Sequence, residues 1–493
     1  MKKRGGWMGI GHTINYWNKT QPDKIAILSK EKSITYRDLY NDIQRFQYFL
    51  TDNLGKEKGK KVGILIGNEP EFIELFLAIV TLGWIAIPFD PKWCKKDVQH
   101  VLTVTRPDLL IRSTSFSQKI DYGNIPIISI DVMENVLYNE SIVWEQHDEE
   151  MFYYGFTSGS TGTPKGFMRN HRSWLKSFLA AEEAFQYQMN DTIVAPGPLC
   201  HSLSLFAAIH TIHLGATFYV LPKFKRDEVI QLIHDEVGTV FYVVPTMLQA
   251  IVQENVVLNN AKPKILSSGA KLTKELRQKV KKYIPNSEIY EFYGASELSF
   301  VSYTDESILE KAPKSVGKPF PGVEIIIQKE NGEIGEIEEI GEVIVNSDFL
   351  FSGYVGEQVA TEQVLTNKGA NIGDLGFIDK EGLLNVVGRK KNMMITGGLN
   401  VYPEEVESVI KELEEVEEAA VIGIDDDYWG QKMIAFIQFK NEASVEKVKD
   451  YCKKRLASYK CPKEYYIVQS FPYTSSGKIA RSELKQALKG VSS

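Results

Sequence analysis

Short apolar runs and amphipathic runs alternate along most of this 493-residue chain. The runs at 61–66 and 84–89 are continuously apolar and predict buried strands. Between them, residues 69–82 place apolar side chains at helical spacing. Units of the same kind recur at 206–221, 226–245 and 264–289. Strands separated by helices of this length predict parallel sheet layers and therefore an α/β fold.

The pattern changes near residue 322. Residues 324–327 and 341–345 form short strand-like runs between Gly-rich turns. This texture predicts an antiparallel, barrel-like section at roughly 322–388.

Beyond Gly388 the pattern predicts a compact α+β unit with strands at 419–423 and 433–439. The unit would begin with a helix over 403–418, and we interpret its Glu-rich end, 412–418, as a solvated helix face.

A charged stretch at 389–392 separates apolar strands and marks the most plausible domain boundary. We therefore predict a large N-terminal domain, 1–389, and a small C-terminal domain, 390–493.

Composition is ordinary for a globular protein, with 43% hydrophobic and 25% charged residues, which excludes a disordered chain. The formal charge of −7 gives no reason to expect nucleic acid as a partner. Neither a signal peptide nor a membrane span is evident, because the longest apolar run, 79–89, is about half a span.

The cysteines fit neither a disulfide framework nor a zinc-ligand spacing, so we expect free thiols and a cytoplasmic protein. They are Cys94, Cys200, Cys452 and Cys461.

The segment 157–166 (TSGSTGTPKG) carries the strongest chemical signal. Glycines allow a close backbone approach, and hydroxyls, free N–H groups and an ammonium together make a cradle for a polyphosphate. It differs from a Walker loop because Lys165 stands between Pro164 and Gly166. The alternative is a polar Gly/Ser surface loop.

Together with six later motifs, this segment resembles the adenylate-forming enzymes: acyl- and aryl-CoA ligases, peptide-synthetase adenylation domains and luciferase. The resemblance covers nearly the whole chain, and the motifs follow the family order. The later motifs are Pro198–His201, Ser268–Ala270, Tyr293–Glu297, Gly373–Asp374, Gly388–Lys391 and Ser476–Lys478.

The resemblance implies that a carboxylate attacks the α-phosphate of ATP, which requires charge neutralisation and alignment of the reactants. Glu297 would be a ligand of Mg²⁺, together with Thr161. A surface Glu at a helix start is the alternative for Glu297. The β- and γ-phosphates would be held by Thr157, Ser158, Gly159, Ser160, Thr161, Gly162 and Lys165.

For the nucleoside, the resemblance assigns the ribose to Asp374, although Gly-Asp-Leu-Gly alone would more often be a turn. Arg389 would contact ribose or phosphate. Ser296 stands where relatives usually carry Thr. The residues that would line the adenine are Gly269, Ala270, Glu291, Phe292 and Tyr293. Gly294 and Ser296 complete the AMP-binding set.

Lys478 is the residue expected to bridge the substrate carboxylate and the α-phosphate, and an exposed loop lysine is the alternative. In the family the small domain then rotates, and Lys391 matches the hinge. Gly397 and Gly398 would line the thiol tunnel. Trp429 resembles a CoA-contacting tryptophan, but a buried core Trp is at least as plausible.

His201 would stand beside the acyl carboxylate, although a lone His is more often structural. The Cys200–Leu205 segment contains no carboxylate, which counts against an α-amino acid substrate. We expect the acyl pocket to include His201, Phe241, Val243 and Pro245.

The expected activity is an ATP-dependent carboxylic acid–CoA ligase for a fatty or aryl acid, with ATP, Mg²⁺ and coenzyme A as cofactors. A stand-alone enzyme that loads the acid onto a carrier protein is the nearest alternative. A non-catalytic nucleotide-binding protein is a third. We expect a monomer or homodimer.

Overall fold

A computed structural model describes the chain at residues 9–116, 123–133, 136–138, 147–158, 163–253, 256–396, 399–426, 430–441, 443–473 and 479–491. The chain divides into two compact units. Unit 1 comprises Met1–Ile325 and Val345–Ala370, and unit 2 comprises Ile326–Ile344 and Asn371–Ser493. The domain boundary that we predict at 389/390 stays a prediction.

One sheet of unit 1 has the strand order β15-β14-β13-β12-β11-β9-β10-β1-β2. Its central strands, from β13 to β1, run parallel, whereas β2, β14 and β15 pair antiparallel. The bounds are β1 (Ile25–Leu28), β2 (Ser33–Thr35), β9 (Thr192–Val194), β10 (Thr217–Tyr219), β11 (Val240–Val243), β12 (Lys264–Ser267), β13 (Glu288–Ala295), β14 (Ser299–Thr304) and β15 (Lys318–Pro319).

The second sheet of unit 1 has the order β18-β8-β7-β4-β3-β5-β6. Its strands from β7 to β6 pair in parallel, whereas β8 and β18 pair antiparallel. The bounds are β3 (Lys61–Leu65), β4 (Ile85–Pro88), β5 (Leu109–Arg112), β6 (Ile127–Ser129), β7 (Met151–Ser158), β8 (Pro164–Asn170) and β18 (Gly353–Tyr354). The predicted α/β fold with parallel layers is therefore confirmed.

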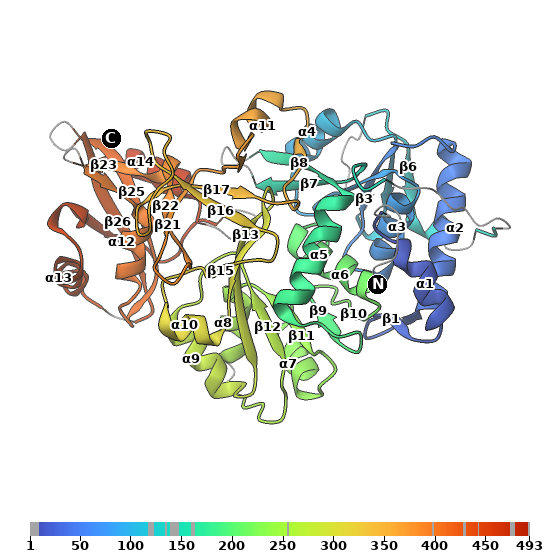
Figure 1. The fold of residues 1–493 in the computed structure, drawn as a ribbon, viewed down its shortest axis with the longest axis horizontal. Coiled ribbons are helices and arrows are strands. Elements are labelled where there is room, and N and C mark those ends of the chain that lie inside the picture. The colour runs from blue at the N-terminus through green and yellow to red at the C-terminus, as the bar shows by residue number, and fades with distance from the viewer. Residues whose placement is uncertain are drawn as a thin grey trace. The chain divides into compact units, whose positions relative to one another are not determined.

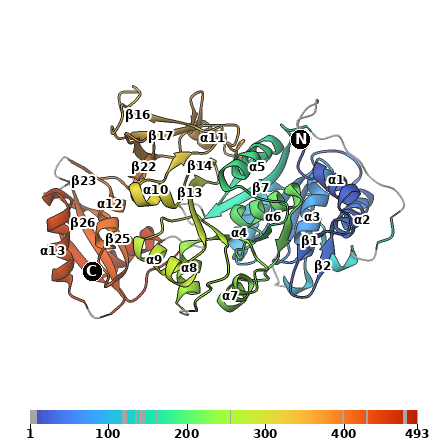
Figure 2. The same cartoon turned by 60° about the horizontal axis from the view of Figure 1, so that its bottom comes forward.

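Helix α5 packs between these two sheets, because it contacts β8 of one and β14 of the other (Figures 1 and 2). Its Trp174 ring lies 5.2 Å from Phe152 and 5.4 Å from Phe206. Asn170 caps the helix by accepting from the Ser173 N–H at 2.9 Å. Burying large aromatic side chains contributes about 1.5–3 kcal/mol each and fixes the two sheets to one core.

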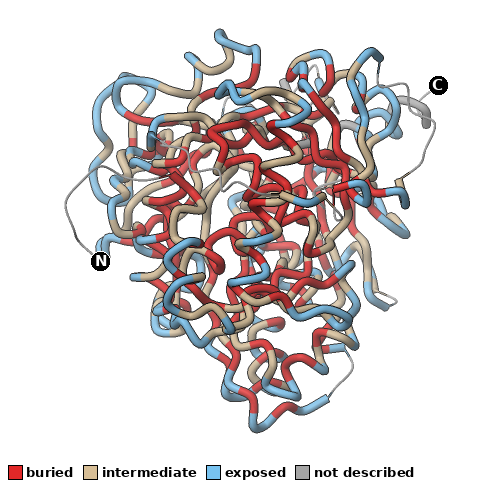
Figure 3. Tube along the Cα trace, turned by 90° about the vertical axis from the view of Figure 1, so that its right-hand side faces the viewer, coloured by how far each residue is buried: buried red, intermediate tan, exposed pale blue. Residues whose placement is uncertain are grey.

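The helices of unit 1 cover the sheets, and Figure 3 shows the buried residues running through the interior. None of the helices within the described ranges has the length and apolar character needed to cross a membrane. Their bounds are α1 (His12–Thr20), α2 (Tyr36–Leu54), α3 (Pro70–Thr81), α4 (Lys95–Thr105), α5 (His171–Phe185), α6 (Ser202–Leu214), α7 (Arg226–His234), α8 (Pro245–Val252), α9 (Lys274–Tyr283), α10 (Glu306–Lys311) and α11 (Gln358–Val364).

The predicted antiparallel section is a sheet with the order β19-β20-β17-β21-β22 and with β16 beside β17. The chain passes between the two units within β16, within β17 and after β20. The bounds are β16 (Glu324–Gln328), β17 (Gly341–Asn346), β19 (Leu365–Thr366), β20 (Gly369–Ala370), β21 (Asp374–Ile378) and β22 (Leu384–Arg389).

The end of unit 2 is an α+β arrangement with the strand order β24-β23-β26-β25 and with β27 beside β26. Val406 and Ile410 of α12 pack in its core with Val448 and Cys452 of α13. The bounds are β23 (Met394–Thr396), β24 (Leu399–Val401), α12 (Pro403–Ile410), β25 (Val416–Asp426), β26 (Gly430–Phe439), α13 (Val445–Arg455), β27 (Glu464–Ile467) and α14 (Arg481–Val491).

The predicted helix over 403–418 is wrong in its second half. Helix α12 ends at Ile410, and β25 already begins at Val416. Leu413 and Val416 are buried, and Val416 pairs with Phe439 of β26. The Glu-rich stretch 412–418 is therefore a turn and a strand start, not a helix face, because pairing with a distant strand outweighs local helix propensity.

Candidate active site

The predicted phosphate loop connects β7 and β8, which form an antiparallel hairpin. Thr157 pairs with Lys165, and Ser158 pairs with Pro164. Gly159, Ser160, Thr161 and Gly162 lie outside the described residues. The structure thus places Thr157 opposite Lys165 at the base of the loop.

Lys165 lies over an aromatic ring that sequence reasoning missed. Its Nζ is 3.4 Å from the centroid of the Tyr354 ring and 3.6 Å from Oε2 of Glu357. The Tyr354 hydroxyl donates to Oε1 of Glu297 at 2.8 Å. One tyrosine therefore links the lysine predicted to bind phosphate with the carboxylate predicted to bind Mg²⁺.

Buried Arg169 fixes the backbone that carries Glu297. Its guanidinium donates to the carbonyl of Ser296 at 2.6 Å and also to the carbonyl of Phe349. Burial lowers the pKa of Arg169 to about 10, although the nearby Glu297 charge opposes that shift. The Phe351 N–H donates to the Glu297 carbonyl at 2.8 Å. The Glu297 carboxylate is thus held on a rigid support, and its oxygens are the hard donors that Mg²⁺ prefers.

The predicted adenine residues lie in the turn after β12 and on the neighbouring strand β13. Gly269 has φ +92° in the turn after β12, a conformation that glycine adopts without strain. The Ser268 hydroxyl donates to the carbonyl of Phe292 on β13 at 3.0 Å and joins the turn to that strand. Exposed Ala270 follows Gly269 in the same turn.

The Glu291 side chain stabilises this turn. Its carboxylate is buried and accepts from the Leu272 N–H at 3.1 Å and from Arg277 at 3.0 Å. Phe292 packs against Phe300, with ring centroids 5.1 Å apart. Tyr293 is half-buried at the end of the strand. The adenine roles of these three residues stay predictions.

Gly294 and Ser296 lie in the same segment as these residues. A Cβ on Gly294 would stand 2.0 Å from the Ser299 carbonyl oxygen, so only glycine fits. The Ser296 side chain is half-buried. Their nucleotide contacts stay predictions.

Asp374 and Arg389 meet in unit 2. They are partners on β21 and β22, and Nε of Arg389 lies 2.8 Å from Oδ1 of Asp374. The Asp374 side chain is 5% exposed and that of Arg389 is 36% exposed. The structure brings together the two residues predicted to bind ribose.

The predicted hinge residue Lys391 is exposed within a 3₁₀ turn, Lys390–Asn392. On either side of it, Lys390 pairs with Glu342, and Asn392 donates to Glu404 at 2.6 Å. The other residues predicted for thiol transfer and catalysis lie outside the described residues: Gly397, Gly398, Trp429 and Lys478.

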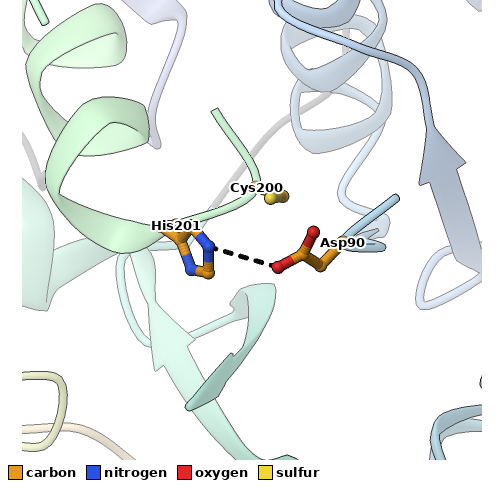
Figure 4. A group of neighbouring side chains, drawn as sticks. All are labelled: Asp90, Cys200 and His201. Carbon is orange, nitrogen blue, oxygen red and sulfur yellow. Dashed lines mark ion pairs between the residues drawn. The ribbon is translucent and has the colours of Figure 1, made fainter. Parts of the chain in front are cut away.

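His201 stands at the N-cap of α6 and faces a buried acid that sequence reasoning missed (Figure 4). Nε2 of His201 lies 3.3 Å from Oδ2 of Asp90, and Cys200 lies beside them, with donor atoms of the three within 4.8 Å. Among the described residues Oδ2 of Asp90 has no other side-chain or backbone donor, so His201 is the group that it faces.

The Asp90 carboxyl is ionised at neutral pH. Burial alone would raise its pKa, but His201 and the Lys92 N–H, which donates to Oδ1 at 2.9 Å, together lower it. Burial raises the pKa of the Cys200 thiol far above its usual range, so the thiol is neutral.

The other predicted acyl-pocket residues lie on β11 and at the start of α8. Phe241 and Val243 are buried in the hydrophobic core together with Leu248, and Pro245 is half-buried. Phe241 and Val243 are thus core residues. That these residues and Pro245 contact the acid stays a prediction.

Comparisons with known proteins show which family this chain resembles. The family model "AMP-binding enzyme" matches residues 14–355, and "AMP-binding enzyme C-terminal domain" matches residues 405–478. An uncharacterized acyl–CoA ligase, YhfT, from Bacillus subtilis is 36% identical over 98% of both chains. A putative long chain fatty acid–CoA ligase, VraA, from Staphylococcus epidermidis is 32% identical over 97% of both chains.

A 2-succinylbenzoate–CoA ligase from Oceanobacillus iheyensis is 30% identical over 94% of this chain and 96% of its own. Among solved structures, o-succinylbenzoate CoA synthetase (MenE) from Bacillus subtilis in complex with its acyl-adenylate intermediate matches with a TM-score of 0.88. It is 26% identical and covers 96% of this chain and 97% of its own. The same enzyme in complex with ATP and a magnesium ion gives the same TM-score and identity.

Proposed function

The chain belongs to the AMP-binding enzyme family, and from that premise we propose that it is an ATP-dependent carboxylic acid–CoA ligase. The acid and ATP would first give an acyl-adenylate and pyrophosphate. Coenzyme A would then displace AMP to give the acyl-CoA. The relatives are named for CoA and not for a carrier protein, so the carrier-loading alternative is not favoured.

The contact chain Lys165–Tyr354–Glu297 is the observation that carries this proposal. It places a cation and a carboxylate at the foot of a Gly/Ser-rich loop, where a triphosphate and its metal need both charges. Mg²⁺ bound at Glu297 would neutralise phosphate charge. Lys165 would bind phosphate oxygens, and Tyr354 would hold the Glu297 carboxylate in one orientation.

In unit 2, Asp374 would accept from the ribose hydroxyls while Arg389 holds its carboxylate. We further propose that Lys478 aligns the substrate carboxylate with the α-phosphate and that Lys391 is the hinge between the half-reactions. Gly397 and Gly398 would then admit the thiol, with Trp429 near the CoA nucleotide.

The acid is proposed to be a fatty or aryl carboxylate, since the relatives' names include both classes. A role in fatty acid metabolism and a cytoplasmic location are proposals of the same kind. The four thiols are unpaired, which suits a reducing compartment.

Acid-dependent pyrophosphate release tests the proposal. The purified chain would be incubated with ATP, Mg²⁺ and a panel of short, medium and long fatty acids, benzoates and 2-succinylbenzoate, with and without CoA. We expect one acid class to stimulate release, and acyl-CoA to appear by mass spectrometry only with CoA. Release unaffected by CoA would favour a carrier acceptor, and no release with any acid would refute the ligase.

A further inference from the structure

The pair Asp90–His201 is built asymmetrically. The Asp90 side chain is 4% exposed, whereas that of His201 is 34% exposed. Oδ1 of Asp90 accepts the Lys92 N–H, while Oδ2 has no directed hydrogen bond from the described residues and faces the imidazole. A buried carboxylate oxygen without a full partner is costly, so its orientation toward His201 calls for an explanation.

Both halves of the pair sit on fixed backbone. The Trp93 N–H donates to the Asp90 carbonyl at 3.0 Å and closes the turn after β4. On the other side, Asn68 donates to the Gly197 carbonyl at 2.8 Å and accepts the Leu199 N–H at 2.8 Å. The backbone that carries each side chain of the pair is therefore held in place by hydrogen bonds.

The ionised Asp90 carboxylate is an acceptor only, so the ring nitrogen that faces it is stabilised by carrying a proton. This nitrogen is Nε2, and Figure 4 shows the other ring nitrogen turned away from Asp90. Lys92 and Cys200 are the other titratable groups close to the Asp90 charge, and the Cys200 thiol is neutral. Asp90 thus determines which nitrogen of His201 remains for a ligand.

We propose that Asp90 is the positioning residue for His201: it holds Nε2–H toward itself and leaves Nδ1 to meet the carboxylate of the acid substrate. When both ring nitrogens carry a proton, Nε2–H faces Asp90 and Nδ1–H donates to that carboxylate. The inference rests on the proposed function and adds a residue outside the recognised motifs. An apo contact of this length would tighten when the substrate binds.

Steady-state kinetics with a double-mutant cycle test the proposal. Asp90→Asn should raise the KM for the acid about tenfold, whereas the KM for ATP should change less than about twofold. Asp90→Asn added to His201→Ala should cause no further loss, because the two residues act as one unit. An equal loss in both backgrounds, or equal increases in both KM values, would overturn the proposal.

A measurement without turnover separates this inference from the proposed function. Solid-state NMR of protein labelled with ¹⁵N-histidine, with His201→Ala used for assignment, reports which ring nitrogen is protonated. We expect Nε2–H in the wild type, a changed pattern in Asp90→Asn and the wild-type pattern in Cys200→Ala. An identical His201 signal in wild type and Asp90→Asn would overturn the inference. No turnover with a normal Nε2–H signal would refute only the ligase.

Discussion

Units 1 and 2 each bury a carboxylate against a basic side chain, but the two pairs are completed differently. Glu407 in unit 2 accepts from the Val421 N–H at 2.7 Å, and both of its oxygens accept from Arg481 at 2.6 Å. Asp90 in unit 1 has one oxygen without a directed hydrogen bond from the described residues. Glu407 has both oxygens saturated, as a structural pair requires, whereas the half-satisfied Asp90 carboxylate beside half-exposed His201 is where we propose a site.

Removing the saturated pair should have the largest effect on stability. Glu407→Ala leaves half-buried Arg481 without its bidentate partner, and breaking a buried ion pair typically costs about 3–5 kcal/mol. Because the Arg481 side chain is 31% exposed, we expect the low end, about 3 kcal/mol, from urea denaturation. Exposed Glu446, which pairs with Lys449, is the matched control, and Glu446→Ala should cause no measurable loss of stability. Equal losses in the two variants would break the comparison.

Lys478 of unit 2 should differ from Glu407. Its loss should lower activity but leave the free energy of unfolding unchanged. Lys478→Ala should slow acyl-adenylate formation on the order of a hundredfold, or about 2.7 kcal/mol, since one preorganised charge is lost. Transfer of CoA onto presynthesised acyl-AMP should largely persist.

Pyrophosphate release and thioester formation, measured separately, test this difference. Equal loss in both half-reactions, or a large fall in the free energy of unfolding, would contradict the role that we propose for Lys478.

Asp374 offers an intermediate case, because its buried carboxylate pairs with Arg389 and is also assigned to ribose. Asp374→Ala should raise the KM for ATP about tenfold, or about 1.4 kcal/mol, and leave the KM for the acid nearly unchanged. Initial rates over a matrix of ATP and acid concentrations check this. An unchanged dependence on ATP would make Asp374 a structural partner of Arg389, like Glu407 with Arg481.

The sequence predicts local features of the fold well. Strands β3 and β4 and helix α3 lie within one or two residues of their predicted bounds, because each is encoded by a contiguous apolar run. The helix over 403–418 fails, since β25 is defined by pairing with β26 and not by local propensity. Long-range pairing leaves no mark in a single short window.

The candidate site also contains residues that the sequence predicts and residues that it does not. Motif residues such as Lys165 and Asp374 can be predicted from the sequence because glycines and charged residues cluster around them in the chain. The residues that hold the motifs in place cannot be predicted in this way. Tyr354 lies 57 residues from Glu297 in the chain, and Arg169 lies 127 residues from Ser296. Sheet topology brings them together, so neither a tyrosine at 354 nor an aspartate at 90 carries a local signal of its role.

The smallest expected effect is on stability in unit 1. Asp90→Asn should change the free energy of unfolding by less than about 1 kcal/mol, because the amide oxygen still accepts the Lys92 N–H. The pKa of Asp90 is lowered from its ordinary 3.8, so its contribution is fully present above that value and is lost only as the pH falls through the lower folded value. In urea denaturation, the stability difference between wild type and Asp90→Asn should therefore shrink as the pH falls below about 4. A loss as large as that of Glu407→Ala would make Asp90 structural and erase the distinction between the two pairs.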